Sequence, residues 1–196
     1  MNPLTHQIAA EAARLIADSG MEYGSAKLKA AKGLGGRRAQ MPSNEAVEDE
    51  LREHLSLFCA DTQPAELRAL REVALQWMQR LATFRPYLSG GVWRGTATRL
   101  SAVHIDLYCD DPKSAPIALL NMGLVHQVDS LDNGDDPVTV LTVATLSPAL
   151  GDSVTVHLFV RDADELRGAL KPDSRGQTWR GNSQALRQRM AAGHAG

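Results

Sequence analysis

The segment from Leu88 to Asp111 contains the residues whose types and spacing are best suited to chemistry. Two adjacent glycines, Gly90 and Gly91, predict a turn in which backbone N–H groups can approach a phosphate without obstruction by side chains. The run Val103–Cys109 alternates between apolar and polar residues and predicts a strand. Two carboxylates at positions i and i+2 of a strand lie on one face and can hold a divalent metal between them. The segment therefore predicts phosphate binding beside a strand with a polar face.

The order of these residues resembles the signature of the DNA polymerase β-like nucleotidyltransferase superfamily, in particular its minimal bacterial members. There a Gly-Gly or Gly-Ser pair is followed by Arg-Gly-Thr, then by serine and a strand with two alternating carboxylates. The resemblance implies a nucleoside triphosphate ligand, Mg²⁺ or Mn²⁺ as the metal, and transfer of a nucleotide monophosphate onto a hydroxyl. It also implies seven nucleotide-binding positions in this chain, which are Gly90, Gly91, Arg94, Gly95, Thr96, Arg99 and Ser101.

The chain departs from this signature at its acidic positions. With Ser101 in register, the two positions fall on Ala102 and His104, and a slip of two residues moves them to His104 and Asp106. Neither register supplies two carboxylates. The family's third carboxylate comes from a neighbouring strand, and the predicted strand Val154–Val160 offers only a histidine there. The candidate catalytic residues are Asp106 and His104, and the candidate metal ligands are Asp106, His104 and His157.

Three interpretations of this segment remain open. In the first, a nucleotidyltransferase fold has lost its metal chemistry and binds a nucleotide, RNA or a protein partner. In the second, an atypical site is active through Asp106, His104 and His157, and its histidines favour a softer metal than Mg²⁺. In the third, the run Arg94–Ser101 matches the signature by chance.

A second group of candidate residues lies near the N-terminus. Clustered Lys and Arg side chains can bind phosphates without sequence preference. The cluster includes Lys29 and Lys32 near the end of a predicted helix and Arg37 and Arg38 just after it. The simpler interpretation is a glycine-terminated helix followed by a turn, and the functional interpretation is an RNA or phosphate contact through these four residues.

The periodicity of apolar residues predicts the elements that must position these groups. Helices are predicted over 4–19, 22–33, 44–58 and from 61 or 62 to about 84, and later over 113–122, 162–170 and 183–192. Strands are predicted over 103–109, 124–128, 138–144 and 154–160, and a turn over 132–136. The fold class is therefore α+β, with an N-terminal helical region packed on a small nucleotidyltransferase-like mixed sheet with flanking helices. We expect a helical domain over 1–86, an α/β domain over 87–172 and a basic tail over 173–196.

Composition limits the remaining possibilities. The 196 residues carry a formal net charge of −2, and no apolar run approaches the roughly 18 residues that span a membrane. Cys59 and Cys109 stand far apart without metal-ligand spacing, as expected of free thiols in a cytoplasmic protein. A protein partner or self-association is also expected. The whole chain is similar to uncharacterised bacterial proteins that sometimes carry a UDP-N-acetylmuramate–alanine ligase label, although it lacks that enzyme's ATP-binding loop.

Overall fold

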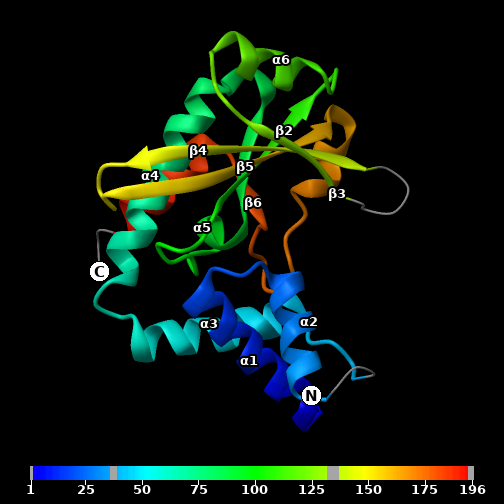
Figure 1. Cartoon of the computed structure of the whole chain (residues 1–196), viewed down its shortest axis with the longest axis vertical. Coiled ribbons are helices and arrows are strands. Elements are labelled where there is room, and N and C mark those ends of the chain that lie inside the picture. Colours follow the sequence, from blue (N-terminus) through cyan, green and yellow to red (C-terminus); the bar gives the residue numbers. More distant parts are fainter. Residues whose placement is uncertain (1, 36–38, 132–136, 194–196) are drawn as a thin grey trace. The chain divides into compact units, whose positions relative to one another are not determined.

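The computed structural model describes residues 2–35, 39–131 and 137–193. The chain divides into two compact units (Figure 1). The first comprises Met1–Leu67 together with the short segment Thr96–Ser101, and the second comprises Arg68–Gly95 and Ala102–Gly196. The predicted turn over 132–136 lies outside the described residues.

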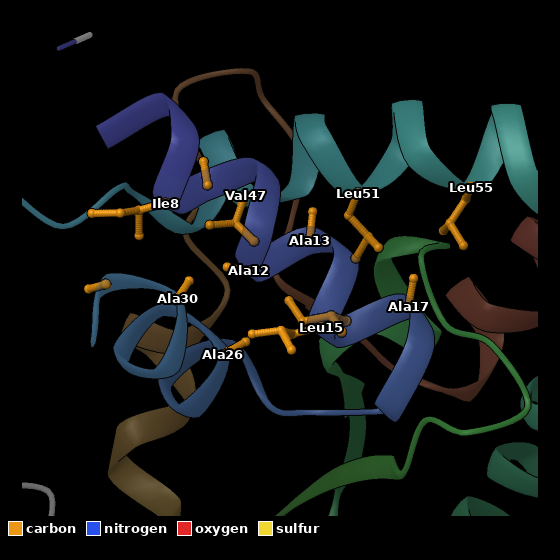
Figure 2. Close-up of a cluster of buried hydrophobic side chains, with 13 residues drawn as sticks. Ile8, Ala12, Ala13, Leu15, Ala17, Ala26, Ala30, Val47, Leu51 and Leu55 are labelled. Carbon is orange, nitrogen blue, oxygen red and sulfur yellow. The ribbon is translucent and has the colours of Figure 1, made fainter. Parts of the chain in front are cut away.

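Three helices lie wholly within the described part of the first unit. They are α1 (Pro3–Ser19), α2 (Tyr23–Gly33) and α3 (Asn44–Phe58), which confirms the three predicted helices to within one residue. The side chains of Asn2 and Ser43 accept hydrogen bonds from the first turns of α1 and α3, which fixes where these helices begin. Many of the buried residues on α1 and α2 are alanines, so the helix backbones approach closely, as Figure 2 shows.

The segment 96–101 packs on the end of α1. Gly20 ends this helix with φ of 64°, and a Cβ atom there would lie only 2.2 Å from the carbonyl oxygen of Leu100. Glycine is therefore required at this position both for the backbone conformation and for the close approach.

A six-stranded mixed sheet forms the centre of the second unit. Its strands are β1 (Pro86–Ser89), β2 (Val103–Cys109), β3 (Gln127–Leu131), β4 (Val138–Ser147), β5 (Asp152–Asp162) and β6 (Arg180–Gly181). The spatial order is β3-β4-β5-β2-β1-β6, and within the described residues β2 and β5 pair in parallel while the other neighbouring strands are antiparallel. The order of the strands therefore differs from their order in the chain.

The helices of the second unit join and flank these strands. α4 (Gln63–Arg80) begins in the first unit, and a 3₁₀ turn (Ala82–Phe84) follows it. The others are α5 (Gly90–Arg94), α6 (Ser114–Asn121), a 3₁₀ turn (Ala163–Glu165) with α7 (Leu166–Ala169), and α8 (Ser183–Ala192). Among the described residues no helix has the length and apolar character to cross a membrane.

The two faces of the sheet differ in character. On one face Val103, Ile105 and Leu107 of β2 are fully buried, as are Val156 and Leu158 of β5, so this face belongs to the apolar core. The opposite face presents the alternate residues of the same strands, and these are mostly polar. The candidate site lies on that polar face.

The structure corrects several sequence-based expectations about these elements. The predicted strand over 124–128 lies instead at Gln127–Leu131. The short elements β1, α5 and β6 were not predicted, because each is too short to show a period of its own. The predicted final helix over 183–192 is confirmed as α8.

Candidate functional site

The strand register brings three of the predicted residues onto one face of the sheet. In the parallel β2–β5 pair His104 lies beside His157, and Asp106 lies beside Phe159. In the antiparallel β1–β2 pair Ser89 lies beside His104. Residues paired in this way project from the same face. His104 and Asp106 share a face of β2, as its alternation predicted, and the pairing of β2 with β5 places His157 beside His104 on that face.

Asp106 is buried and is held by two arginines. The side chain is only 2% exposed, and its Oδ1 accepts a hydrogen bond of 2.5 Å from Nε of Arg161, two residues beyond Phe159 on β5. Its Oδ2 accepts no hydrogen bond among the described residues and lies 3.4 Å from Nη1 of Arg180 on β6. Two guanidinium groups thus surround one carboxylate.

A tyrosine completes this charged network. Nη1 of Arg180 donates a hydrogen bond of 2.6 Å to the hydroxyl of Tyr108, on the same face of β2 as Asp106. Burial raises the pKa of Tyr108, and the Asp106 carboxylate raises it further, so the phenol stays neutral. Burial by itself would lower the pKa of Arg161, but the charge and hydrogen bond of Asp106 outweigh it and raise that pKa.

The two histidines lie against each other beside this network. Their rings meet edge to face with centroids 5.5 Å apart, and the His104 ring also meets Phe159 at 5.4 Å. Nδ1 of His157 is 2.9 Å from the hydroxyl oxygen of Thr142 on β4. The two rings therefore form part of an aromatic surface, and His157 also contacts the hydroxyl of Thr142.

These residues do not fit the two-metal centre that the family resemblance implies. Mg²⁺ and Mn²⁺ prefer several oxygen ligands, whereas Asp106 is the one carboxylate at this place on β2 and is already shared by two arginines. Within the described ranges no group of three or more His, Cys, Asp or Glu side chains could hold a metal ion. A metal ion at Asp106 would have to displace the guanidinium groups of Arg161 and Arg180, which already provide the positive charge beside this carboxylate.

Gly90 and Gly91 lie beside the histidines, at the point where β1 ends and α5 begins. Gly90 has φ of 67°, and a Cβ atom there would lie 3.1 Å from Nδ1 of His104. The turn therefore passes directly over His104, which only glycine allows without displacement. Gly95 ends α5 with φ of 89° and donates its N–H to the carbonyl of Gly91.

Arg94 lies on α5, and its side chain is buried inside the protein. Its guanidinium forms an ion pair of 3.0 Å with Asp173, and the two side chains are 4% and 1% exposed. The same group lies 4.3 Å from the ring centroid of Trp179. Its charge is therefore engaged inside the protein, in a contact that fixes the segment before β6.

Three predicted nucleotide-binding residues belong to the first unit. Thr96 is buried and its hydroxyl has no hydrogen-bond partner among the described residues. The backbone N–H of Arg99 donates to the carboxylate of Glu66 at 2.9 Å, and the hydroxyl oxygen of Ser101 accepts the N–H of Thr98 at 3.0 Å. These three residues belong to a different unit from Gly90, and the site formed by Gly90, His104 and Asp106 lies within the second unit.

The predicted basic cluster is only partly described. Lys29 and Lys32 are exposed on α2, and Arg37 and Arg38 lie outside the described residues. Lys27, nearby on the same helix, donates to the side chain of Asn44 at 2.8 Å.

Sequence reasoning missed the two arginines that surround Asp106. Arg161 could have been found, because the alternation of His157 and Phe159 continues to it when the strand is extended by one residue. Arg180 gave no comparable signal, since its place follows from the pairing of β6 with β1. The site is therefore more cationic than its predicted members indicated.

Comparison with protein-family models gives no match for this chain, and comparison with curated proteins gives none either.

Proposed function

We propose that the second unit is a nucleotidyltransferase-like domain that binds a nucleotide through its phosphates without two-metal chemistry. The order β1, Gly90-Gly91, α5, β2 supports this proposal, because it sets a glycine turn beside a strand with polar side chains, as the superfamily signature requires. The antiparallel pairing of β1 with β2 and the approach of Gly90 to His104 also agree with it.

The observation that carries the proposal is the pairing of Asp106 with both Arg161 and Arg180. One carboxylate neutralises one guanidinium, so this pairing leaves a positive charge in excess. Glu165 lies 3.5 Å from Arg161, but its side chain is half-exposed and solvent weakens that contact. Guanidinium groups bind phosphate with directed hydrogen bonds and can take over the charge neutralisation that metal ions provide elsewhere.

The first test is nucleotide binding in the absence of metal. We expect isothermal titration with ATP to give the same affinity in EDTA as in Mg²⁺. Arg180→Gln should weaken binding by about 10-fold or more, the scale of one lost hydrogen bond to a charged group. Arg187→Gln, a matched charge removal on the exposed part of α8, should leave the affinity unchanged. Binding that requires Mg²⁺, or no loss in Arg180→Gln, would contradict the proposal.

The alternative is an active site built from Asp106, His104 and His157, which the contact between the two histidine rings favours. It predicts incorporation of label from NTPs with Mn²⁺ or Mg²⁺ and its loss in Asp106→Ala. Incorporation by the wild type that disappears in this variant would replace our proposal with catalysis. An RNA or a protein in place of a free nucleotide would appear as binding without competition by ATP.

A further inference from the structure

β3 is an edge strand of the sheet that carries exposed apolar side chains. β3 is the last strand at one end of the sheet, and no described strand pairs with its outer side (Figure 1). All five of its residues are exposed. Val128 is 61% and Leu131 is 50% exposed, and Val125, just before the strand, is 93% exposed. Exposed apolar edge strands are uncommon because they pair readily with other chains.

This apolar exposure continues upstream in the chain. Ile117 and Leu120 of α6 and Met122 at its end are between 46% and 65% exposed. From Ile117 to Leu131 the only Asp, Glu, Lys or Arg is Asp129. Large exposed apolar side chains with so little charge among them are typical of protein–protein contacts rather than of free surface.

The sequence around β3 is complementary to itself when read in the opposite direction. In an antiparallel pair, opposite residues lie on the same face, so a two-fold axis through the sheet must pass beside a residue and its own copy. An axis at Asp129 would oppose two like charges, which is unfavourable. An axis at Val128 instead opposes Val128 to Val128, Gln127 to Asp129 and Val125 to Leu131. Apolar residues then meet apolar residues, and the carboxylate meets an amide.

We propose that this protein forms a two-fold dimer in which the β3 strands of two copies pair antiparallel, centred on Val128. The pairing joins the two sheets into one and satisfies the unpaired backbone groups at both edges. It also places Val128 of the two copies side by side and Val125 of each copy beside Leu131 of the other. A five-residue strand offers little area beside the roughly 800 Å² that each partner contributes to a stable interface. We therefore expect a dissociation constant in the micromolar range.

The first test is the oligomeric state of the full chain. Sedimentation velocity across a range of concentrations should show a reversible monomer–dimer equilibrium. Val128→Lys places two like charges at the axis and should raise the dissociation constant at least 10-fold, with circular dichroism confirming that the fold is kept. Leu57→Lys, which removes a similarly exposed leucine from α3, should have no effect. A monomer at all concentrations, or equal effects of both variants, would overturn the proposal.

The second test addresses the register of the β3–β3 pairing and does not depend on weakening the dimer. Opposite residues of antiparallel strands have Cα atoms about 4.5–5.5 Å apart, within the range that a disulfide spans. In a Cys59→Ser background, Val128→Cys should cross-link to itself on mild oxidation. His126→Cys and Ser130→Cys should each stay monomeric when oxidised alone and cross-link when mixed. Cross-linking in any other combination would rule out the pairing centred on Val128.

Discussion

At the scale of single residues, the chemical role of Asp106 depends on the groups around it. A carboxylate on the polar face of a sheet can bind metal, activate a water or form an ion pair, and its own chemistry does not distinguish these. Asp106 is buried, its Oδ1 accepts a hydrogen bond from Arg161, and its Oδ2 lies 3.4 Å from Arg180, which also donates to Tyr108. The consequence is a carboxylate that orients two arginines rather than one that holds a cation.

The buried ion pair between Arg94 and Asp173 can be tested through the pH dependence of the protein's stability. The N–H of Gln177 lowers the pKa of Asp173 below 3.8 most strongly, burial opposes this, and the N–H of Arg175 and the Arg94 guanidinium lower it further. Because the folded-state pKa is the lower one, the stabilisation is complete above the unfolded-state pKa and is lost as pH falls through the folded-state value. Asp173→Asn should therefore be less stable than the wild type at pH 7, and the difference should shrink below about pH 4.

This pH dependence can be measured by thermal unfolding of both proteins between pH 7 and pH 2. Glu53→Gln, the same change from carboxyl to amide on the exposed surface of α3, serves as the control and should follow the wild type throughout. A difference between wild type and Asp173→Asn that stays constant down to pH 2 would show that the charge of Asp173 does not contribute.

At the scale of elements, the segment from residue 172 to residue 181 ties the C-terminal part of the second unit to α5. Nε1 of Trp93 donates to the carbonyl of Thr178 at 2.8 Å, and Arg94 pairs with Asp173. The guanidinium of Arg189 from α8 lies over the ring of Trp93, 3.9 Å from its centroid. The residues predicted as a basic tail are thus part of the fold as far as α8. They also deliver Arg180 to the site.

Gly181 tests this packing directly. A Cβ atom at position 181 would lie 2.0 Å from the ring of Trp93, so Gly181→Ala forces β6 and α5 apart. We expect a loss of about 1–3 kcal/mol in the free energy of unfolding, as for other overpacked cores, measured by urea denaturation. Gly168→Ala in α7 is the matched control, since no atom lies within 4 Å of its added methyl group and alanine favours the helix. Equal stability of the two variants would contradict the described contact.

At the scale of the whole molecule, charge is distributed unevenly over a chain whose formal net charge is only −2. The exposed lysines of α2 belong to the first unit, and the arginine network belongs to the second. An RNA partner, predicted from the basic cluster, would therefore depend on the first unit and respond to different substitutions than the nucleotide site.

The salt dependence of RNA binding tests that expectation. Each phosphate contact contributes about 0.7–0.9 to the slope of log affinity against log salt concentration. In a mobility-shift titration we expect Lys29→Gln combined with Lys32→Gln to weaken binding and to reduce the slope by about 1.4–1.8. Removing two other exposed lysines, Lys113→Gln with Lys171→Gln, should change neither. A slope that is the same in both double variants would exclude α2 as the contact.

The sequence by itself determined the elements with enough residues to show a period. Helices α1, α3 and α8 and strand β2 begin and end within a residue of their predicted limits, because a repeat of 3.6 or 2 residues reports which side is buried. The same alternation placed His104 and Asp106 on one face. A run as short as β6 carries no such signal, and its residues become a strand only because β1 is there to pair with them.

Only the tertiary structure decided what the polar face is able to do. Arg161 and Arg180 stand 55 and 74 residues beyond Asp106 in the chain, and both reach it because β5 lies against β2 and β6 lies against β1. Spacing along the sequence constrains neighbours within one element, whereas ion pairs between strands depend on which strands are adjacent. For that reason the residue types indicated a metal site, and the folded chain has a carboxylate enclosed by arginines.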